Sequence, residues 1–477
     1  MRNEIRYKWI IAVLTFLLVA APIAVQVRLY KAAPYVTIGI SGSQSGSENP
    51  GGNGDSGSKP SNSDGTAKVG IAGSISTRDG EIVYDGVNTK YPAFYAVVGN
   101  VTSNSLAKHL SEHTLAYRYQ DVLAASKLTV VGGLHTFKGR SGSRMTTTLL
   151  PGPTHQTLYE AFDEYNGALV AYNYRTGEIL VLVSVPSAQS GNEGDAYLTN
   201  RVLGTYSPGS TIKIITLICA LSQNPELENF TYTCTGSYAL SGSEPVTCGA
   251  AHYGPLTMRD AIGHSCNCYF AALIGQLDVN DTRDVLEELG FSTVKGESGT
   301  GNVDRLTYTK GYSAFRSTKS FDEVWRLIGS GSVVSMIDMV RIAGAVVNGG
   351  EAADPYIVET IYNPNKEKVT YQAEKGSMTQ LVDPEVADNL SEMWSDAVEE
   401  YYYTRSTPLD RRISHAKTGT SELIDANGEE YNNRLLLGVM EEENVAFMLV
   451  VEHLPAGSSK IITIANTLAQ IISEADF

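Results

Sequence analysis

The chain has 477 residues, of which 42% are hydrophobic and 18% are charged, and its mean hydropathy is −0.11. This composition supplies a large core and excludes a wholly disordered chain. The 36 basic and 52 acidic residues leave a net charge of −16, which argues against a nucleic-acid-binding surface. Five cysteines are too few for a disulfide scaffold and show no repeated zinc-ligand spacing. We therefore expect no metal, no cofactor and no nucleic-acid partner.

The N-terminus carries a long apolar segment. Residues Trp9–Val27 contain no charged side chain and are long enough to cross a bilayer core of ~30 Å as a helix. Three basic residues precede the segment, and Pro22 after Ala20 and Ala21 makes a poor signal-peptide cleavage site. We predict that residues 1–31 form a short cytoplasmic tail and a transmembrane anchor that is not cleaved, with the rest of the chain outside a bacterial cell.

Three further segments are predicted from composition and pattern. Residues 32–66 are rich in Gly, Ser, Asn, Pro and Asp, which is typical of a flexible linker. Residues 67–152 have a mixed pattern and a length that suits a small pedestal module. Residues 153–477 contain no linker-like break and are long enough for one catalytic domain.

Within the large segment, apolar runs predict strands early, helices in the middle, and strands followed by a helix late. The turn Thr176-Gly177 between two apolar runs predicts a β-hairpin. Strands at both ends of the segment indicate an α+β fold whose antiparallel sheet is closed by the two ends of the domain. The predicted strands are Gly167–Tyr174, Glu178–Val185, Leu435–Met440 and Val445–Leu454, and the predicted helices are Thr211–Leu221, Ser335–Val347 and Thr463–Ile472.

The first chemical motif is the S-x-x-K at Ser210 and Lys213. Residues three apart share a helix face, so the lysine amine can reach the serine hydroxyl and remove its proton. The pattern alone is weak, because it also occurs at Ser56–Lys59 and Ser105–Lys108, and because a serine at a helix start is often only a capping residue. Only the motif at Ser210 has a Pro-Gly entry and a long apolar helix behind it.

Two more motifs follow. Ser265 and Asn267 form an S-x-N, a pair that could pass a proton and orient an amide, although helix capping is the simpler reading. Lys417-Thr-Gly-Thr420 is a K-T-G that comes just before the later strands, so we expect it to end or line an edge strand. Its lysine supplies positive charge, its glycine admits a ligand backbone and its threonines can bind a carboxylate. The motifs occur in the order 210, 265 and 417, with gaps of 55 and 152 residues (265 − 210 and 417 − 265). This trio is typical of β-lactamases and penicillin-binding proteins.

Beyond the motifs, the segment from Tyr159 to Glu452 resembles the transpeptidase domain of penicillin-binding proteins. The stretches around Arg175-Thr-Gly, Ser207-Pro-Gly and Asn348-Gly-Gly resemble the opening hairpin, the nucleophile segment and the region between the second and third motifs. The resemblance implies the β-lactamase/transpeptidase-like fold and the short class B type, with an anchor and a pedestal that resembles a dimerisation module. Asn433–Gly438 departs from the family pattern, because no aromatic residue precedes the glycine.

The resemblance also implies roles for the catalytic residues. Ser210 would be the acylated nucleophile, Lys213 its general base, and Ser265 the relay that carries a proton to the departing D-alanine amine. The backbone N–H groups of Ser210 and Thr420 would form the oxyanion hole.

The remaining motif residues are implied to bind substrate. Asn267 would hold the substrate amide, while Lys417, Thr418 and Thr420 would bind the terminal carboxylate beside Gly419. Lys417 would also lower the pKa of Lys213 through like-charge repulsion.

The implied activity is a D,D-transpeptidase that cross-links peptidoglycan stem peptides ending in D-Ala-D-Ala and is inactivated by β-lactams. The implied partners are the membrane and a SEDS-family glycosyltransferase. A D,D-carboxypeptidase stays open as an alternative, since it differs only in the acceptor. A membrane-tethered β-lactamase is disfavoured because residues 265–417 contain no E-x-x-L-N segment, and a β-lactam sensor because only eight residues precede the anchor.

Three predictions concern residues outside the motifs. Cys234 and Cys248 bracket a Gly/Ser-rich loop outside the membrane, so we predict a disulfide between them, worth ~3 kcal/mol in the chain-entropy model. Cys219 should stay reduced on the nucleophile helix. His415 is expected to pack beside the third motif, and Tyr401–Tyr403 to cover the domain surface.

Overall fold

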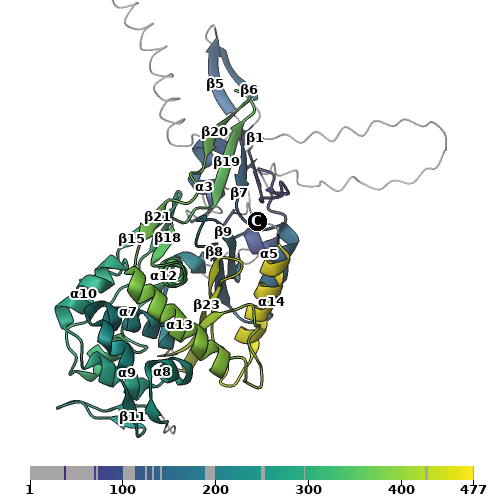
Figure 1. Cartoon of the computed structure of the whole chain (residues 1–477). Helices are drawn as coiled ribbons and strands as arrows, with labels where there is room; N and C mark the ends of the chain where they lie inside the picture. Colours follow the sequence, from purple (N-terminus) through teal and green to yellow (C-terminus); the bar gives the residue numbers. More distant parts are fainter. Residues whose placement is uncertain are drawn as a thin grey trace, which may run out of the picture.

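Figure 1 presents the computed structural model of the chain, in which a narrow sheet at one end stands on a larger α+β body. The structure describes residues 37–38, 69–70 and 73–477, except 87, 100–112, 124–125, 132–133, 140–141, 188–198, 249–252, 295, 425–427 and 476. The predicted anchor and most of the predicted linker lie outside these residues. Within the described part, none of the helices has the length and apolar character needed to span a bilayer.

A five-stranded antiparallel sheet forms the centre of the body, as the sequence predicts. Its order places the two N-terminal strands beside the three C-terminal ones, so both ends of the domain close the sheet. The N-terminal strands are buried along their whole length, because helices cover both faces of the sheet. In spatial order the strands are β22 (His415–Ile424), β23 (Glu430–Met440), β24 (Val445–Val451), β8 (Gly167–Asn173) and β9 (Ile179–Val185).

Four helices cover the sheet. On one side α12 (Met336–Val347) packs on β23, β24 and β8, and α13 (Pro384–Tyr401) packs on β22. On the other side α14 (Lys460–Glu474) and α5 (Gly152–Glu160) lie together against β23, β24 and β9, as Figure 1 shows. The four predicted strands and the two predicted helices that correspond to α12 and α14 are therefore confirmed, although their boundaries are shifted by a few residues.

The rest of the body is a helical lobe beside α12 and α13. The nucleophile segment begins as a short 3₁₀ turn, η3 (Gly209–Ile212), and continues as α7 (Lys213–Gln223), so the predicted helix is confirmed with an altered first turn. The other elements of the lobe are η4 (Pro225–Asn229), β11 (Tyr232–Cys234), β12 (Ser237–Tyr238), β13 (Val246–Thr247), β14 (Gly254–Leu256), α8 (Met258–His264), α9 (Asn267–Ile274), α10 (Val279–Glu288), β15 (Thr300–Val303), β16 (Leu306–Thr309) and α11 (Phe321–Arg326).

The pedestal contains a second five-stranded sheet, which is built from two distant parts of the chain. Strands β3 (Ser74–Ser76), β4 (Ile82–Tyr84) and β7 (Arg144–Thr147) come from the small module. Strands β19 (Val358–Asn363) and β20 (Lys368–Gln372) come from the large segment and complete the sheet beside β7. The pedestal is therefore not formed by residues 67–152 alone.

The remaining elements are short and lie partly in the pedestal and partly in the body. They are β1 (Thr37–Ile38), β2 (Val69–Gly70), η1 (Pro92–Phe94), α3 (Leu115–Arg118), α4 (Gln120–Leu123), β5 (Ser126–Val131), β6 (Leu134–Gly139), η2 (Arg201–Leu203), β10 (Thr205–Tyr206), β17 (Val334–Ser335), β18 (Glu351–Ala353) and β21 (Met378–Gln380).

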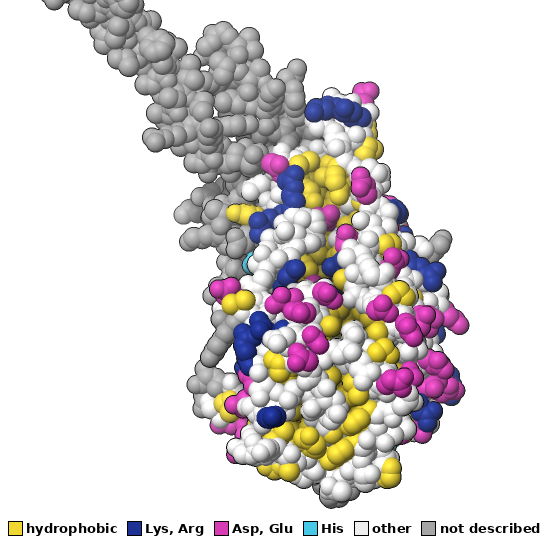
Figure 2. Space-filling model, turned by 60° about the vertical axis from the view of Figure 1, so that its left-hand side comes forward, with side chains coloured by type: hydrophobic (Ala, Val, Ile, Leu, Met, Phe, Trp, Pro, Cys, Tyr) yellow, Lys and Arg dark blue, Asp and Glu magenta, His cyan; other side chains and the backbone are white. Residues whose placement is uncertain are grey.

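The surface reflects the acidic composition of the chain. On the face shown in Figure 2, acidic side chains gather along one side, with basic side chains scattered between them. The described residues of this face form no continuous basic field of the kind that binds a phosphate backbone.

Candidate active site

The nucleophile segment lies directly against the edge strand of the central sheet. Gly209 has a φ of +50°, and a Cβ atom placed on it would lie 2.4 Å from the backbone oxygen of Thr420. A Cβ on Gly419 would lie 2.6 Å from the backbone oxygen of Pro208. Only glycine at these two positions permits such an approach. The turn that carries Ser210 and the K-T-G strand are thus in backbone contact.

The second motif occupies the junction of two helices. Helix α8 ends at His264, and Ser265 then adopts the left-handed conformation, with φ 57° and ψ 39°. Cys266 caps α9, which begins at Asn267. A left-handed serine is uncommon and is retained where the surrounding structure fixes it. The sharp junction places both polar side chains of the motif beside Lys213.

Two buried lysines converge on the hydroxyl of Ser265. The Nζ of Lys213 donates to Ser265 Oγ at 3.2 Å, to Ser265 O at 2.7 Å and to Asn267 Oδ1 at 2.7 Å. The Nζ of Lys417 donates to the same Oγ at 2.9 Å and to Thr418 O at 3.1 Å. Both lysine side chains are 0% exposed. The first, second and third motifs are therefore joined through a single hydroxyl group.

Burial changes the acidity of both lysines. Desolvation, followed by repulsion from Lys417, holds the pKa of Lys213 well below its usual range. Desolvation, followed by repulsion from Arg405, lowers the pKa of Lys417 to about 7. The predicted like-charge effect of Lys417 on Lys213 is therefore present, although burial is the larger cause. A neutral Lys213 is available as a proton acceptor in such surroundings.

The K-T-G residues occupy β22, at the edge of the sheet, as the sequence predicts. Tyr402 OH lies 3.1 Å from Thr418 Oγ1 and accepts a hydrogen bond from the Thr418 backbone N–H. Arg434, on the neighbouring strand, donates from Nη1 to Thr420 Oγ1. The strand thus presents two threonine hydroxyls whose positions are fixed by neighbouring side chains.

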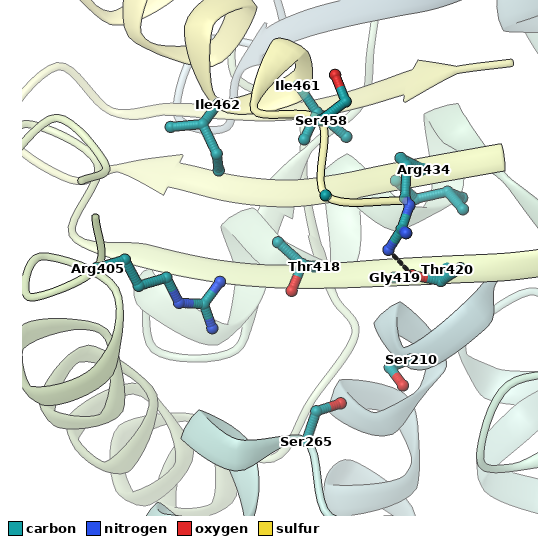
Figure 3. Close-up of a pocket in the computed structure, with 12 residues that line it drawn as sticks. Ser210, Ser265, Arg405, Thr418, Gly419, Thr420, Arg434, Ser458, Ile461 and Ile462 are labelled. Carbon is teal, nitrogen blue, oxygen red and sulfur yellow. Dashed lines mark hydrogen bonds between the residues drawn. The ribbon is translucent and has the colours of Figure 1, made fainter. Parts of the chain in front are cut away.

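These residues border an open cleft of about 340 Å³, a volume that suits a small-molecule or peptide site. In Figure 3 the hydroxyls of Ser210 and Ser265 lie close together on one side of β22, while Thr418 and Thr420 lie on the strand. The lining comprises Ser210, Ser265, Arg405, Thr418, Gly419, Thr420, Arg434, Leu435, Gly457, Ser458, Ile461 and Ile462. The two lysines contact this lining through the Ser265 hydroxyl, and Asn267 contacts Lys213.

Two arginines and two isoleucines line the cleft at positions that were not predicted from the sequence. Arg405 follows α13, Arg434 lies on β23, and Ile461 and Ile462 begin α14. No motif marks these positions, because the contacts that bring them to the cleft are tertiary. Arg434 lies in the segment Asn433–Gly438, which departs from the family pattern because no aromatic residue precedes its glycine. Arg434 and Leu435 line the cleft on this side.

The structure tests the expectations for His415 and for the tyrosine run Tyr401–Tyr403. His415 is buried, and its Nε2 lies 3.0 Å from Ser391 Oγ, so the prediction that it packs beside the third motif is confirmed. The prediction that the tyrosine run covers the surface is wrong for Tyr402, which is 1% exposed and contacts Thr418. It lies at the end of α13, where it turns toward β22.

The predicted disulfide partners are neighbours in space. Cys234 Sγ and Cys248 Sγ are 4.0 Å apart and carry free thiols, and Cys266 and Cys268 lie beside them. Cys219 is buried on α7. The pairing of Cys234 with Cys248 stays a prediction, and it competes with other arrangements of the same four sulfurs.

Comparison with known proteins agrees with this geometry. The family model for the penicillin-binding protein transpeptidase domain matches residues 167–472. Stage V sporulation protein D of Bacillus subtilis is 25% identical over 273 residues, which cover 56% of this chain and 41% of that protein. Peptidoglycan D,D-transpeptidase PbpA of Mycobacterium tuberculosis is 27% identical over 321 residues, which cover 60% of this chain and 62% of that protein. The matches thus span less than two thirds of these relatives.

Solved structures show the same fold. The D,D-transpeptidase domain of a peptidoglycan glycosyltransferase from Eggerthella lenta superposes with a TM-score of 0.66 at 23% identity, covering 84% of this chain and 98% of that one. The penicillin G acyl-enzyme complex of penicillin-binding protein A from M. tuberculosis gives 0.64 at 21% identity, covering 84% and 98%.

Proposed function

This chain belongs to the penicillin-binding protein transpeptidase family, and from this premise we propose that it is a serine D,D-transpeptidase of peptidoglycan. Its substrates would be stem peptides that end in D-Ala-D-Ala, and β-lactams would acylate the same serine. The observation that carries the proposal is the convergence of two buried lysines on Ser265, at the base of the cleft that Ser210 lines.

The proposed first step is acylation of Ser210. Ser210 Oγ attacks the carbonyl carbon between the two D-alanines, and its proton passes to the neutral amine of Lys213. The resulting oxyanion is held by the backbone N–H groups of Ser210 and Thr420, which the glycine contact brings together. Ser265 then delivers a proton to the departing D-alanine amine as the C–N bond breaks. The product is an ester between Ser210 and the shortened stem peptide.

The second half of the reaction reverses these roles. An amine of a neighbouring stem peptide attacks the ester carbonyl, loses a proton through Ser265 and Lys213, and forms the cross-link as Ser210 Oγ leaves. The position of Ser265 supports this relay, because its Oγ lies within hydrogen-bond distance of both lysine amines.

Substrate binding is assigned to the strand and its neighbours. Thr418 and Thr420 hydroxyls would bind the terminal carboxylate, and charged Lys417 would attract it, with Arg405 adding positive charge at the mouth of the cleft. Asn267 would hold the substrate amide through the side chain that Lys213 and the Thr247 carbonyl now fix.

The setting of the enzyme is also proposed. A transmembrane anchor at Trp9–Val27 would hold the catalytic domain outside the bacterial membrane, where its substrate lies, and a SEDS-family glycosyltransferase would supply the glycan strands. The acidic surface suits a protein that does not bind nucleic acid.

Intact mass spectrometry after incubation with a labelled penicillin tests the proposal. We expect one adduct per chain on Ser210 that persists for hours, and none with Ser210→Ala. Rapid loss of the adduct would instead identify a β-lactamase. Release of D-alanine from a stem peptide without cross-linking, in the presence of an acceptor amine, would identify a carboxypeptidase.

A further inference from the structure

Four of the five cysteines of the chain lie together, immediately behind the second motif. Cys234 ends β11, Cys248 follows β13, Cys266 caps α9, and Cys268 lies in its first turn. The four come from three separate segments, with gaps of 14, 18 and 2 residues (248 − 234, 266 − 248 and 268 − 266). The fold, and not a sequence motif, brings them together.

The distances between the sulfur atoms are short enough for a metal ion to contact several of them at once. Cys248 Sγ lies 3.4 Å from Cys268 Sγ, 3.5 Å from Cys266 Sγ and 4.0 Å from Cys234 Sγ. The sulfurs of Cys234, Cys248 and Cys266 all lie within 4.8 Å of one another. Four thiolates around Zn²⁺ at ~2.3 Å would have S···S distances of ~3.8 Å. A disulfide would use only one of the three neighbours of Cys248, whereas a metal ion would use them together.

The backbone around the cluster is arranged to stabilise negative sulfur. The N–H of Gly236 donates to Cys234 Sγ at 3.4 Å, that of Cys268 to Cys248 Sγ at 3.3 Å, and that of Tyr269 to Cys266 Sγ at 3.4 Å. Hydrogen bonds of this kind orient metal ligands and balance their charge. Cys268 differs, because its thiol donates to the Val246 carbonyl at 3.6 Å. Three sulfurs are therefore set as acceptors, and the fourth lies within reach of Cys248.

Burial also fits a structural ion. Cys234, Cys266 and Cys268 are at most 2% exposed, while Cys248 is half-buried and offers a route of entry. Zinc prefers thiolate ligands and needs no redox chemistry to bind them.

We propose that Cys234, Cys248 and Cys266 bind a zinc ion, with Cys268 turning from the Val246 carbonyl to become the fourth ligand. The ion would hold the second motif in place, because Cys266 stands between Ser265 and Asn267, and because Asn267 Nδ2 donates to the carbonyl of Thr247, next to Cys248, at 3.0 Å. The cysteines are positioning residues in this proposal and take no part in the chemistry. The effect on acylation rests on the proposed function, whereas the metal binding does not.

The test begins with the full chain, purified without oxygen in a phosphine reductant and then exposed to zinc. We expect one zinc per chain by native mass spectrometry and metal analysis. Cobalt(II) as a probe should give the intense thiolate-to-cobalt charge-transfer absorption and the visible bands of a tetrahedral site. Cys248→Ser and Cys266→Ser should each lose the zinc and the absorption. Cys219→Ser, which changes the one cysteine outside the cluster, should keep both.

The second measurement is penicillin acylation of the wild-type chain before and after a chelator removes the zinc. We expect acylation to slow at least tenfold without the ion and to recover when zinc is returned, with circular dichroism confirming that the protein stays folded. Zinc binding without any acylation would overturn the proposed function and leave the metal site standing. A reduced chain that binds no zinc, or a zinc-exposed chain that carries a mapped Cys234–Cys248 disulfide in place of the ion, would overturn the metal site.

Discussion

At the scale of the residue, the two lysines of the site have the same side chain and opposite proposed duties. Lys213 must be neutral to accept the Ser210 proton, and Lys417 must be charged to attract a carboxylate. The structure gives both a lowered pKa, with burial as the main cause for each. Substitutions that keep the charge but remove the ability to lose a proton therefore separate the two duties.

Ser210→Ala should abolish penicillin acylation, and Lys213→Arg should slow it ~10²–10⁴-fold, because a guanidinium with a pKa above ~12 cannot act as a base. Lys417→Arg should cost only about tenfold, since arginine also binds carboxylates well. Stopped-flow acylation of the folded variants measures this order. Faster acylation by Lys213→Arg than by Lys417→Arg would mean that another residue is the base.

The same pKa values predict a bell-shaped pH dependence. Acylation should rise with pH as Lys213 loses its proton, and should fall above about 7 as Lys417 loses the charge that binds the carboxylate. In Lys417→Arg the alkaline fall should disappear, because the guanidinium stays charged. Second-order acylation rates measured from about pH 5 to about pH 10 test this prediction. An unchanged alkaline limb in the arginine variant would assign it to a different group.

At the scale of the element, the contact between η3 and β22 positions the reacting atoms. This contact depends on Gly209, whose Cβ position is filled by the Thr420 backbone and whose φ is positive. The two N–H groups of the proposed oxyanion hole come from these two elements, so their spacing depends on the same contact.

Gly209→Ala should therefore slow acylation by ~10²–10³-fold, the loss that accompanies removal of one oxyanion donor. Gly242→Ala is a matched control, because this glycine also has a positive φ, of 74°, but has open space around its Cβ position. Both variants should fold by circular dichroism. Equal acylation by the two variants would show that the close approach does not matter for catalysis.

The cysteine cluster also depends on how elements are placed, since its sulfurs come from the end of β11, the residue after β13 and the start of α9. Cys266 lies between Ser265 and Asn267 in the chain, so a change at the cluster can reach the second motif through the adjoining peptide bonds.

At the scale of the whole molecule, the two predicted segments, residues 67–152 and 153–477, both contribute strands to the pedestal sheet. The Thr148 backbone N–H donates to the Ile357 carbonyl at 2.8 Å, and its hydroxyl donates to the Ile179 carbonyl at 2.7 Å. Buried Ile75, Met145 and Ile361 belong to the same hydrophobic core. The two segments, which the sequence predicts as separate modules, therefore pack around one continuous hydrophobic core.

A shortened chain that begins at Ala67 should be soluble and acylated by penicillin at the rate of the full chain. It retains all five strands of the pedestal sheet, and every described residue that lines the cleft lies at or after Ser210. Size-exclusion chromatography and penicillin labelling measure the outcome. Loss of labelling in a folded product would show that residues 1–66 contribute to the site.

A shortened chain that begins at Pro153 should behave differently and aggregate. It lacks β3, β4 and β7, so β19 would keep only β20 as a partner, and its other edge and the apolar residues beneath it would be exposed. The two chains differ by 86 residues (153 − 67), and none of those that the structure describes lines the cleft. A soluble, labelled product from the shorter chain would mean that the body is stable without the rest of the pedestal.

The sequence by itself predicted four strands of the central sheet, the helices that correspond to α7, α12 and α14, and the three motifs. Periodicity and turn residues are local signals, and a buried strand or an apolar helix retains its pattern whatever surrounds it. The edge position of Lys417 and the packing of His415 also followed from local pattern and were confirmed.

Only the tertiary structure decided how these parts meet. Arg405 and Arg434 reach the cleft from the turn after α13 and from β23, and Tyr402 contacts Thr418 from the end of α13. No spacing along the chain records such contacts. The hairpin β19–β20 joined the pedestal for the same reason, since strands pair by position in space. The cysteines show the difference most directly. Gaps of 14 and 18 residues resemble no metal motif, and folding brings the sulfurs within 4 Å of Cys248, because long-range packing places three distant segments at one point.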